Sequence, residues 1–155
     1  MKYEVKSVGI VECAPSFRIR LESEYAAGLT GLDGFSHVSV VWYADKIPAW
    51  QPNALVFPSP YKGAPEKMGV FATRTPFRPN GICVSTARLV SFDCKSGILE
   101  LEWIDAEAGT PVLDIKPYHP SEDRVLSAHV PDWAAAWPAS YEASADFPWE
   151  DVFLF

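Results

Sequence analysis

The sequence predicts a mainly β, all-β-class fold, a barrel or a sandwich of short antiparallel or mixed strands, on three observations. Five or more short segments are rich in apolar and β-branched residues, and no helical pattern alternates with them. Fourteen prolines favour short strands and shaped loops over long helices. A length of 155 residues with 48% hydrophobic and 21% charged residues is typical of one folded domain with its own core. We therefore expect a single domain over residues 1–155.

The first half of the chain shows the alternation of half-buried strands. The stretch "FRIRLE" places its apolar side chains on one face and Arg18 and Arg20 on the other. The expected elements are strands at 2–13 and 17–22, a short helical turn within 23–34 and a strand at 35–44. The N-terminal strand lacks the uninterrupted apolar core of a signal peptide, and no apolar run approaches the roughly 20 residues that span a membrane. These features predict a cytoplasmic protein.

The second half begins with a long excursion. Residues 45–67 are rich in proline and show little periodicity, which is typical of a loop that carries function. Further strands are expected at 68–74, 82–93, 97–105 and 111–118. The tail, residues 119–155, contains many aromatic residues and one helical turn around Trp133–Trp137. We expect this tail to pack over the outside of the sheet or against a second subunit.

Charge and missing motifs exclude several classes of function. The chain lacks the glycine-rich nucleotide-binding patterns and the Gly-x-Ser-x-Gly elbow of hydrolases. Its three histidines are too scattered for a metal cage, and its three cysteines include no Cys-x-x-Cys pair, so reduced thiols and no metal are expected. A net charge of −7 argues against a sequence-blind nucleic-acid coat protein but leaves room for a local basic site.

The stretch "RTPFRPN" predicts a stiff loop that aims two arginines. Pro76 and Pro79 fix the backbone and remove two amide donors, and Asn80 can bond its own turn. Arg74 and Arg78 are then held in place, and a planar guanidinium suits a carboxylate, a phosphate or an aromatic face. The alternative is that both arginines pair with acidic neighbours on the surface.

A second stretch, "DAEAGTPVLDIKPY", couples a tight turn to a polar strand. The glycine of "AGTP" permits a close backbone approach, and the strand after it is expected to place Val112, Asp114, Lys116 and Tyr118 on one face. A functional site and an ordinary exposed charge pair on an edge strand both fit this pattern.

Three blocks of the sequence together resemble the TsaA-like family, which includes the methyltransferase TrmO. These blocks are "GLDGFSH" at 31–37, "GVFATRTPFRPN" at 69–80 and "GTPVLDIKPY" at 109–118. The resemblance runs over residues 5–118 and leaves residues 119–155 as an extension like that of short family members. It implies a small β-barrel that binds S-adenosylmethionine, forms a homodimer, and methylates threonylcarbamoyladenosine beside the tRNA anticodon.

The resemblance also implies site residues, by position. Cofactor contacts are implied at His37, Val38, Arg74, Val84, Ala108, Gly109, Thr110 and Pro111. In this reading the arginine holds a carboxylate or polarises the adenosine end of the cofactor. The valine forms an apolar wall for adenine, and the amides of the glycine-threonine turn face the ligand. Residues expected to orient the methyl acceptor, and so to serve catalysis, are Arg78, Asp114, Lys116 and Tyr118.

At three positions the chain departs from the family pattern. Gly81 stands where the family has proline, Cys83 where it has glycine or alanine, and Ala108 where it has aspartate. Loss of the proline is expected to loosen the loop. Two alternatives to the tRNA enzyme therefore stay open: a non-catalytic module that binds S-adenosylmethionine or another adenosine compound, and a methyltransferase for a small acceptor. An active tRNA enzyme predicts a basic face made by Arg18, Arg20, Arg74, Arg78, Arg88 and Lys116.

Overall fold

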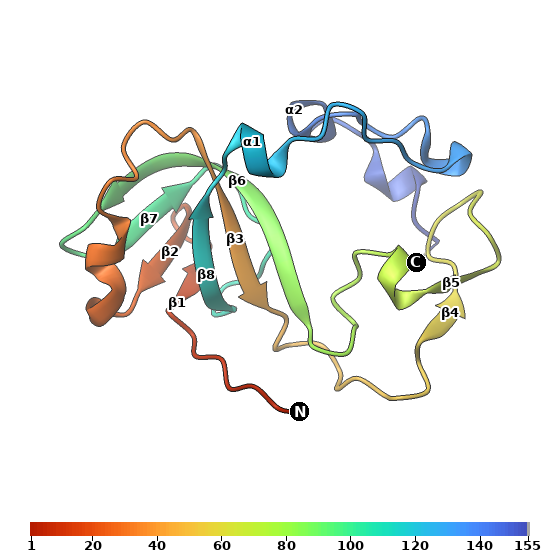
Figure 1. Ribbon diagram of the computed structural model, residues 1–155, viewed down its shortest axis with the longest axis horizontal. Helices are drawn as coiled ribbons and strands as arrows, with labels where there is room; N and C mark the ends of the chain where they lie inside the picture. Colours follow the sequence, from red (N-terminus) through yellow and green to blue (C-terminus); the bar gives the residue numbers. More distant parts are fainter. Residues whose placement is uncertain (155) are drawn as a thin grey trace. The chain divides into compact units, whose positions relative to one another are not determined.

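The computed structural model describes residues 1–154 and contains a closed six-stranded barrel (Figure 1). The strands follow one another around the barrel in the order β1-β2-β7-β6-β3-β8, and every neighbouring pair is antiparallel. They are β1 (Gly9–Glu12), β2 (Phe17–Leu21), β3 (His37–Tyr43), β6 (Ile82–Asp93), β7 (Ile98–Leu101) and β8 (Pro111–Pro117). The predicted mainly β class is confirmed, and the barrel is the right one of the two predicted architectures.

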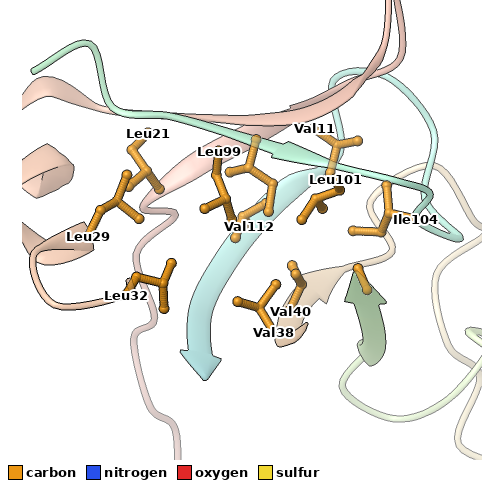
Figure 2. Close-up of a cluster of buried hydrophobic side chains, with 12 residues drawn as sticks. Val11, Leu21, Leu29, Leu32, Val38, Val40, Leu99, Leu101, Ile104 and Val112 are labelled. Carbon is orange, nitrogen blue, oxygen red and sulfur yellow. The ribbon is translucent and has the colours of Figure 1, made fainter. Parts of the chain in front are cut away.

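Alternate side chains of the strands fill the barrel and form its core (Figure 2). Ile19 of β2 is fully buried while Arg18 and Arg20 lie outside, which confirms the alternation predicted for this strand. A 3-10 helix, η1 (Ser23–Leu29), occupies the predicted helical turn. Leu29 and Leu32 reach from this segment into the core.

Strand β6 pairs with two different strands along its length. Its residues Ile82–Arg88 pair with β3, and its residues Leu89–Asp93 pair with β7. The register shifts between Leu89 and Ser91, where an extra residue bulges out of the ladder. A bulge bends a strand and increases its twist. The bend allows the single 12-residue strand β6 to follow the curved wall of the barrel.

Three predicted strands are shorter in the structure. The strand expected at 2–13 begins only at Gly9, because β2 and β8 offer ladder partners to β1 from that residue onward. The strand expected at 97–105 ends at Leu101. The segment expected as a strand at 68–74 contains only β5 (Lys67–Gly69), followed by a 3-10 turn, η2 (Val70–Ala72).

The chain forms two compact units. The barrel unit comprises Met1–Trp50 and Pro76–Arg124, and includes a short helix, α1 (Pro120–Asp123). The second unit contains residues 51–75 and the chain from Val125 onward. In it β4 (Val56–Pro58) pairs with β5, and three short turns follow: η3 (Asp132–Ala134), α2 (Tyr141–Ser144) and η4 (Trp149–Asp151). The helical turn predicted near Trp133 is confirmed.

Aromatic rings hold the second unit together. The ring of Tyr61 stacks on Trp133 at 5.6 Å between centroids and meets Trp137 edge to face at 5.2 Å. Trp149 continues the cluster, 5.6 Å from Trp137. Such ring pairs add stabilisation beyond the apolar area they bury. The aromatic tail thus packs on Tyr61 of the proline-rich excursion.

On the outside of β1 and β2, one carboxylate joins two arginines. Glu12 accepts hydrogen bonds from Arg18 Nε at 2.6 Å and Arg20 Nε at 2.7 Å. The bond from Arg20 is the main reason that the pKa of Glu12 lies below its ordinary value. Glu100 of β7 accepts bonds from Ser16 and Ser91, which likewise hold its pKa low.

We expect the free energy of unfolding to fall as the pH drops below about 4.5, the ordinary pKa of glutamate. A carboxyl group whose pKa is lowered by folding stabilises the folded state above its unfolded pKa, and this contribution is lost when the carboxylate is protonated. Urea unfolding at pH 7, 5, 4 and 3 measures the effect, and Glu12→Gln should flatten the acid limb. Glu4→Gln, in the exposed N-terminal residues, is the control. Identical acid limbs for Glu12→Gln and wild type would contradict this role for Glu12.

Candidate functional site

The outer face of β3 gathers predicted site residues from three strands. Because Val38 and Val40 are fully buried, the alternate residues His37 and Val41 face outward. Val84 of β6 pairs with Val41 on one side, and Asp114 of β8 pairs with it on the other. We call the outward residues of β3, together with those that flank them on β6 and β8, the outer β3 face. Its predicted site residues are His37, Val84, Asp114 and Lys116.

Apolar and polar groups occupy different parts of this face. Tyr43, Ile82 and Val84 are 43%, 41% and 47% exposed and form an apolar strip toward the end of β3. At the other end the Tyr118 ring lies edge-on to His37, with 6.3 Å between ring centroids. The face can thus offer an apolar surface and polar groups to one ligand.

Asp114 and Lys116 form an ion pair on this face. Lys116 Nζ lies 2.6 Å from Asp114 Oδ2, and Asp114 also accepts the Ile115 amide through Oδ1. The hydrogen bond to Asp114 raises the pKa of Lys116 above its ordinary value. Lys116 therefore stays protonated near neutral pH and can donate a hydrogen bond, but it is not a general base there.

A bulge overturns the expected face of β8. The prediction placed Val112 on the same face as Asp114 and Lys116, but Val112 is fully buried. The register between β3 and β8 shifts so that Trp42 pairs with Val112 while Val41 pairs with Asp114. One extra residue, Leu113, therefore reverses the alternation in the strand.

Val38 has a different place from the other predicted contacts. Its side chain is 0% exposed and belongs to the core. Its contribution to a ligand on the outer β3 face is therefore limited to the backbone and to the position it gives His37.

The turn before β8 uses its amides internally. The Gly109 N–H donates to Val11 O at 2.7 Å, and the Thr110 N–H donates to Glu107 O at 3.1 Å. Thr110 is 3% exposed. The expectation that these two amides face a ligand is therefore wrong, because the fold already satisfies both of them.

Lys46, from a distant part of the sequence, binds two residues of this turn. Its Nζ lies 2.5 Å from the Ala108 carbonyl oxygen and 3.1 Å from Glu107 Oε2. The sequence analysis missed this residue, because Lys46 belongs to no motif and lies 61 and 62 residues before its two partners.

The two groups of predicted cofactor contacts lie toward opposite ends of β3. His37 begins this strand, whereas Trp42, near its other end, pairs with Val112 directly after Pro111. At about 3.3 Å per residue, the five steps from His37 to Trp42 span about 17 Å. Within one barrel, His37 and the 108–111 turn are therefore not neighbours.

The predicted arginine loop divides between the two units. Arg74 belongs to the second unit and Arg78 to the barrel unit. In the barrel unit, the Gly81 N–H donates to Arg78 O at 3.1 Å, which closes a turn over Pro79 and Asn80. The Gly81 carbonyl accepts from the Ala44 amide at 2.9 Å. The bond that closes this turn uses the glycine N–H, which proline lacks.

Within the barrel unit, the basic residues predicted to form one face lie on different strands. Arg18 and Arg20 lie on β2, which is opposite β3 in the ring of six strands. Arg88 lies beside His37, where its Nη1 is 3.6 Å from Glu102. Each of these arginines lies beside a carboxylate, which reduces the positive potential that the barrel presents.

Two open hollows lie beside the "GLDGF" segment. They have volumes of about 410 and 160 Å³, and both are lined by Leu32 and Phe35 of the "GLDGF" segment. No predicted cofactor or catalytic residue lines either hollow. Among residues 1–154 no three His, Cys, Asp or Glu side chains are grouped to hold a metal ion. Within the same residues, no helix has the length and apolar character needed to cross a membrane.

Fold and site define a class of protein: a small closed β-barrel with a mixed polar and apolar outer face built on three adjacent strands. The sequence profile of the tRNA-methyltransferase O N-terminal domain matches residues 9–124, and the chain belongs to this family. It is 39% identical over 123 residues to the tRNA (adenine(37)-N6)-methyltransferase of Escherichia coli. The aligned region covers 77% of this chain and 49% of that protein. It is also 42% identical over 100 residues to a probable S-adenosyl-L-methionine-binding protein of Pyrococcus abyssi, covering 64% of this chain and 50% of the relative.

Solved structures agree with this assignment. The crystal structure of TrmO from Pseudomonas aeruginosa matches with a TM-score of 0.65 and 31% identity, over 83% of this chain and 62% of that one. The chain spans about half the length of the two curated relatives.

Proposed function

We propose that the barrel binds S-adenosylmethionine and transfers its methyl group to the modified adenosine beside the tRNA anticodon. The observation that carries the proposal is the outer β3 face, on which His37, Val84 and the Asp114–Lys116 pair all lie. The E. coli relative, named as a methyltransferase of adenine 37 in tRNA, supports this choice of acceptor.

The residues present fit the cofactor by their chemistry. Val84, 47% exposed beside Val41, offers an apolar wall to the adenine ring. Arg74, which belongs to the second unit, is assigned to the cofactor carboxylate by its place in the sequence motif alone, since a guanidinium gives a carboxylate two parallel hydrogen bonds. A Cβ added at Gly109 would meet no atom within 4 Å, so the 108–111 turn leaves open space for a ligand. When bound, S-adenosylmethionine supplies an electrophilic methyl group.

The acceptor must be held in line with that methyl group, and alignment can supply much of the rate. Lys116 stays charged and donates, while Asp114 accepts, so the pair can orient an acceptor amine and its neighbouring polar groups. Arg78 and Tyr118 are assigned to the same task. An anticodon loop suits such a site because it presents unstacked bases.

The proposal includes a homodimer. His37 and the 108–111 turn are about 17 Å apart along β3, so two chains together could bring one copy's turn to the other's outer β3 face. The exposed strip of Tyr43, Ile82 and Val84 is apolar enough to be covered by a second copy.

A second candidate function rests on the charges. The basic groups of Arg18, Arg20, Lys46, Arg88 and Lys116 all lie within 4 Å of a carboxylate oxygen. RNA binding draws its affinity from cations that neutralise phosphates, and the chain has a net charge of −7. This favours a module that binds S-adenosylmethionine without acting on RNA, or an enzyme with a small acceptor. The P. abyssi relative is named only as a binding protein.

Methyl transfer from labelled S-adenosylmethionine tests the choice. The acceptors are tRNA that carries threonylcarbamoyladenosine, the same tRNA without this modification, and buffer alone. We expect label in the first tRNA only, and a loss of turnover in Asp114→Asn with unchanged cofactor affinity. Cofactor binding without transfer to either tRNA would remove the tRNA activity and leave the second candidate.

A further inference from the structure

Lys46, the second residue of the 45–67 excursion, connects that segment to the turn before β8. Its ammonium group binds both the Glu107 carboxylate and the Ala108 carbonyl. Neither partner is buried: the Lys46 and Glu107 side chains are 44% and 78% exposed. An exposed ion pair contributes little by itself. The second bond, to the Ala108 carbonyl, also fixes the position of the turn backbone relative to Lys46.

The turn is held from the opposite side by β1. The Gly109 N–H donates to Val11 O, and the Val11 N–H donates to Thr110 O at 3.0 Å. The Ala108 carbonyl points to Lys46 and is not part of this exchange. Lys46 and Val11 thus fix the turn between them, one through Ala108 and the other through Gly109 and Thr110.

We propose that Lys46 is a positioning residue that holds the 107–110 turn in the conformation required for ligand binding. Ala108 itself carries no carboxylate. The carboxylate of the preceding residue, Glu107, is bound by Lys46 and helps to keep the turn in place. The part of this inference that concerns the cofactor rests on the proposed function, whereas the hold on the turn does not.

Two measurements separate these parts. Amide hydrogen exchange of Gly109 and Thr110 in ligand-free protein should become about fivefold faster in Lys46→Met, because one charged hydrogen bond to the turn is lost. Lys46→Arg should restore most of the protection. Lys95→Met, which removes the same charge in the turn between β6 and β7, should leave both amides unchanged.

Calorimetric titration with S-adenosylmethionine should then show an affinity about fivefold lower in Lys46→Met than in wild type or Lys95→Met. Unchanged exchange at Gly109 and Thr110 would overturn the positioning role. Faster exchange with unchanged affinity would overturn the role of the turn in ligand binding. Faster exchange in a protein whose wild type binds no S-adenosylmethionine would support the hold on the turn and contradict the proposed function instead.

Discussion

Gly9→Ala should lower the free energy of unfolding by about 3 kcal/mol, since it forces backbone atoms apart. Gly9 pairs with Leu21 of β2 and with Val112 of β8. A Cβ at this position would lie 2.5 Å from the Arg20 carbonyl oxygen and 2.8 Å from the Leu21 Cα. Both atoms belong to the backbone, so no side-chain movement relieves the clash. The strands must separate where β1 closes the barrel against β8.

Urea unfolding of Gly9→Ala, with Gly28→Ala as the control, measures the free energy of unfolding of each variant. Gly28 lies in η1, and a Cβ there would meet no atom within 4 Å. Gly28→Ala should therefore change the free energy of unfolding by less than about 1 kcal/mol, and the sign can be favourable. Equal stability of the two variants would contradict the close pairing of β1 with β2.

Gly81→Pro should destabilise this chain by about 3 kcal/mol. Gly81 has φ of +58°, whereas proline fixes φ near about −65°. The variant also loses the N–H that donates to Arg78 O and closes the turn.

Gly81→Ala separates the effect of the positive φ from the effect of the lost N–H. It keeps the N–H, and it places a Cβ 3.2 Å from Tyr43 Cε2 at a positive φ. We expect a loss of about 1–2 kcal/mol, smaller than that of the proline variant. Thermal unfolding of both variants and of wild type gives the order of their stabilities. A proline variant as stable as wild type would show that the 78–81 turn does not have this conformation.

Strands with strict alternation or clear boundaries could be predicted from the sequence. "FRIRL" alternates without interruption, and β6 occupies the predicted residues 82–93, directly after Gly81. Alternation reports which face a side chain takes only while the ladder is regular. The bulge at Leu113 adds one residue to β8, and no local pattern marks it, so the face of Val112 was predicted wrongly.

Hydrogen bonds between distant parts of the chain were beyond sequence reasoning. The amide of Gly109 is the clearest case, because no acceptor for it lies nearby in the sequence. The acceptor of the Gly109 amide is Val11, which becomes its neighbour only when the barrel closes. The same holds for Lys46, whose bond to Ala108 joins residues 62 positions apart. Motifs located the turn, but the fold decides which of its groups a ligand can meet.

Calorimetric titration of ligand-stripped protein with S-adenosylmethionine, for wild type and Arg74→Ala, tests the central claim most directly. We expect wild type to bind and the variant to lose binding, since the guanidinium is assigned to the cofactor carboxylate. Near-equal affinities would remove Arg74 from the site. Absence of binding in wild type would contradict the proposal that this barrel takes S-adenosylmethionine as its ligand.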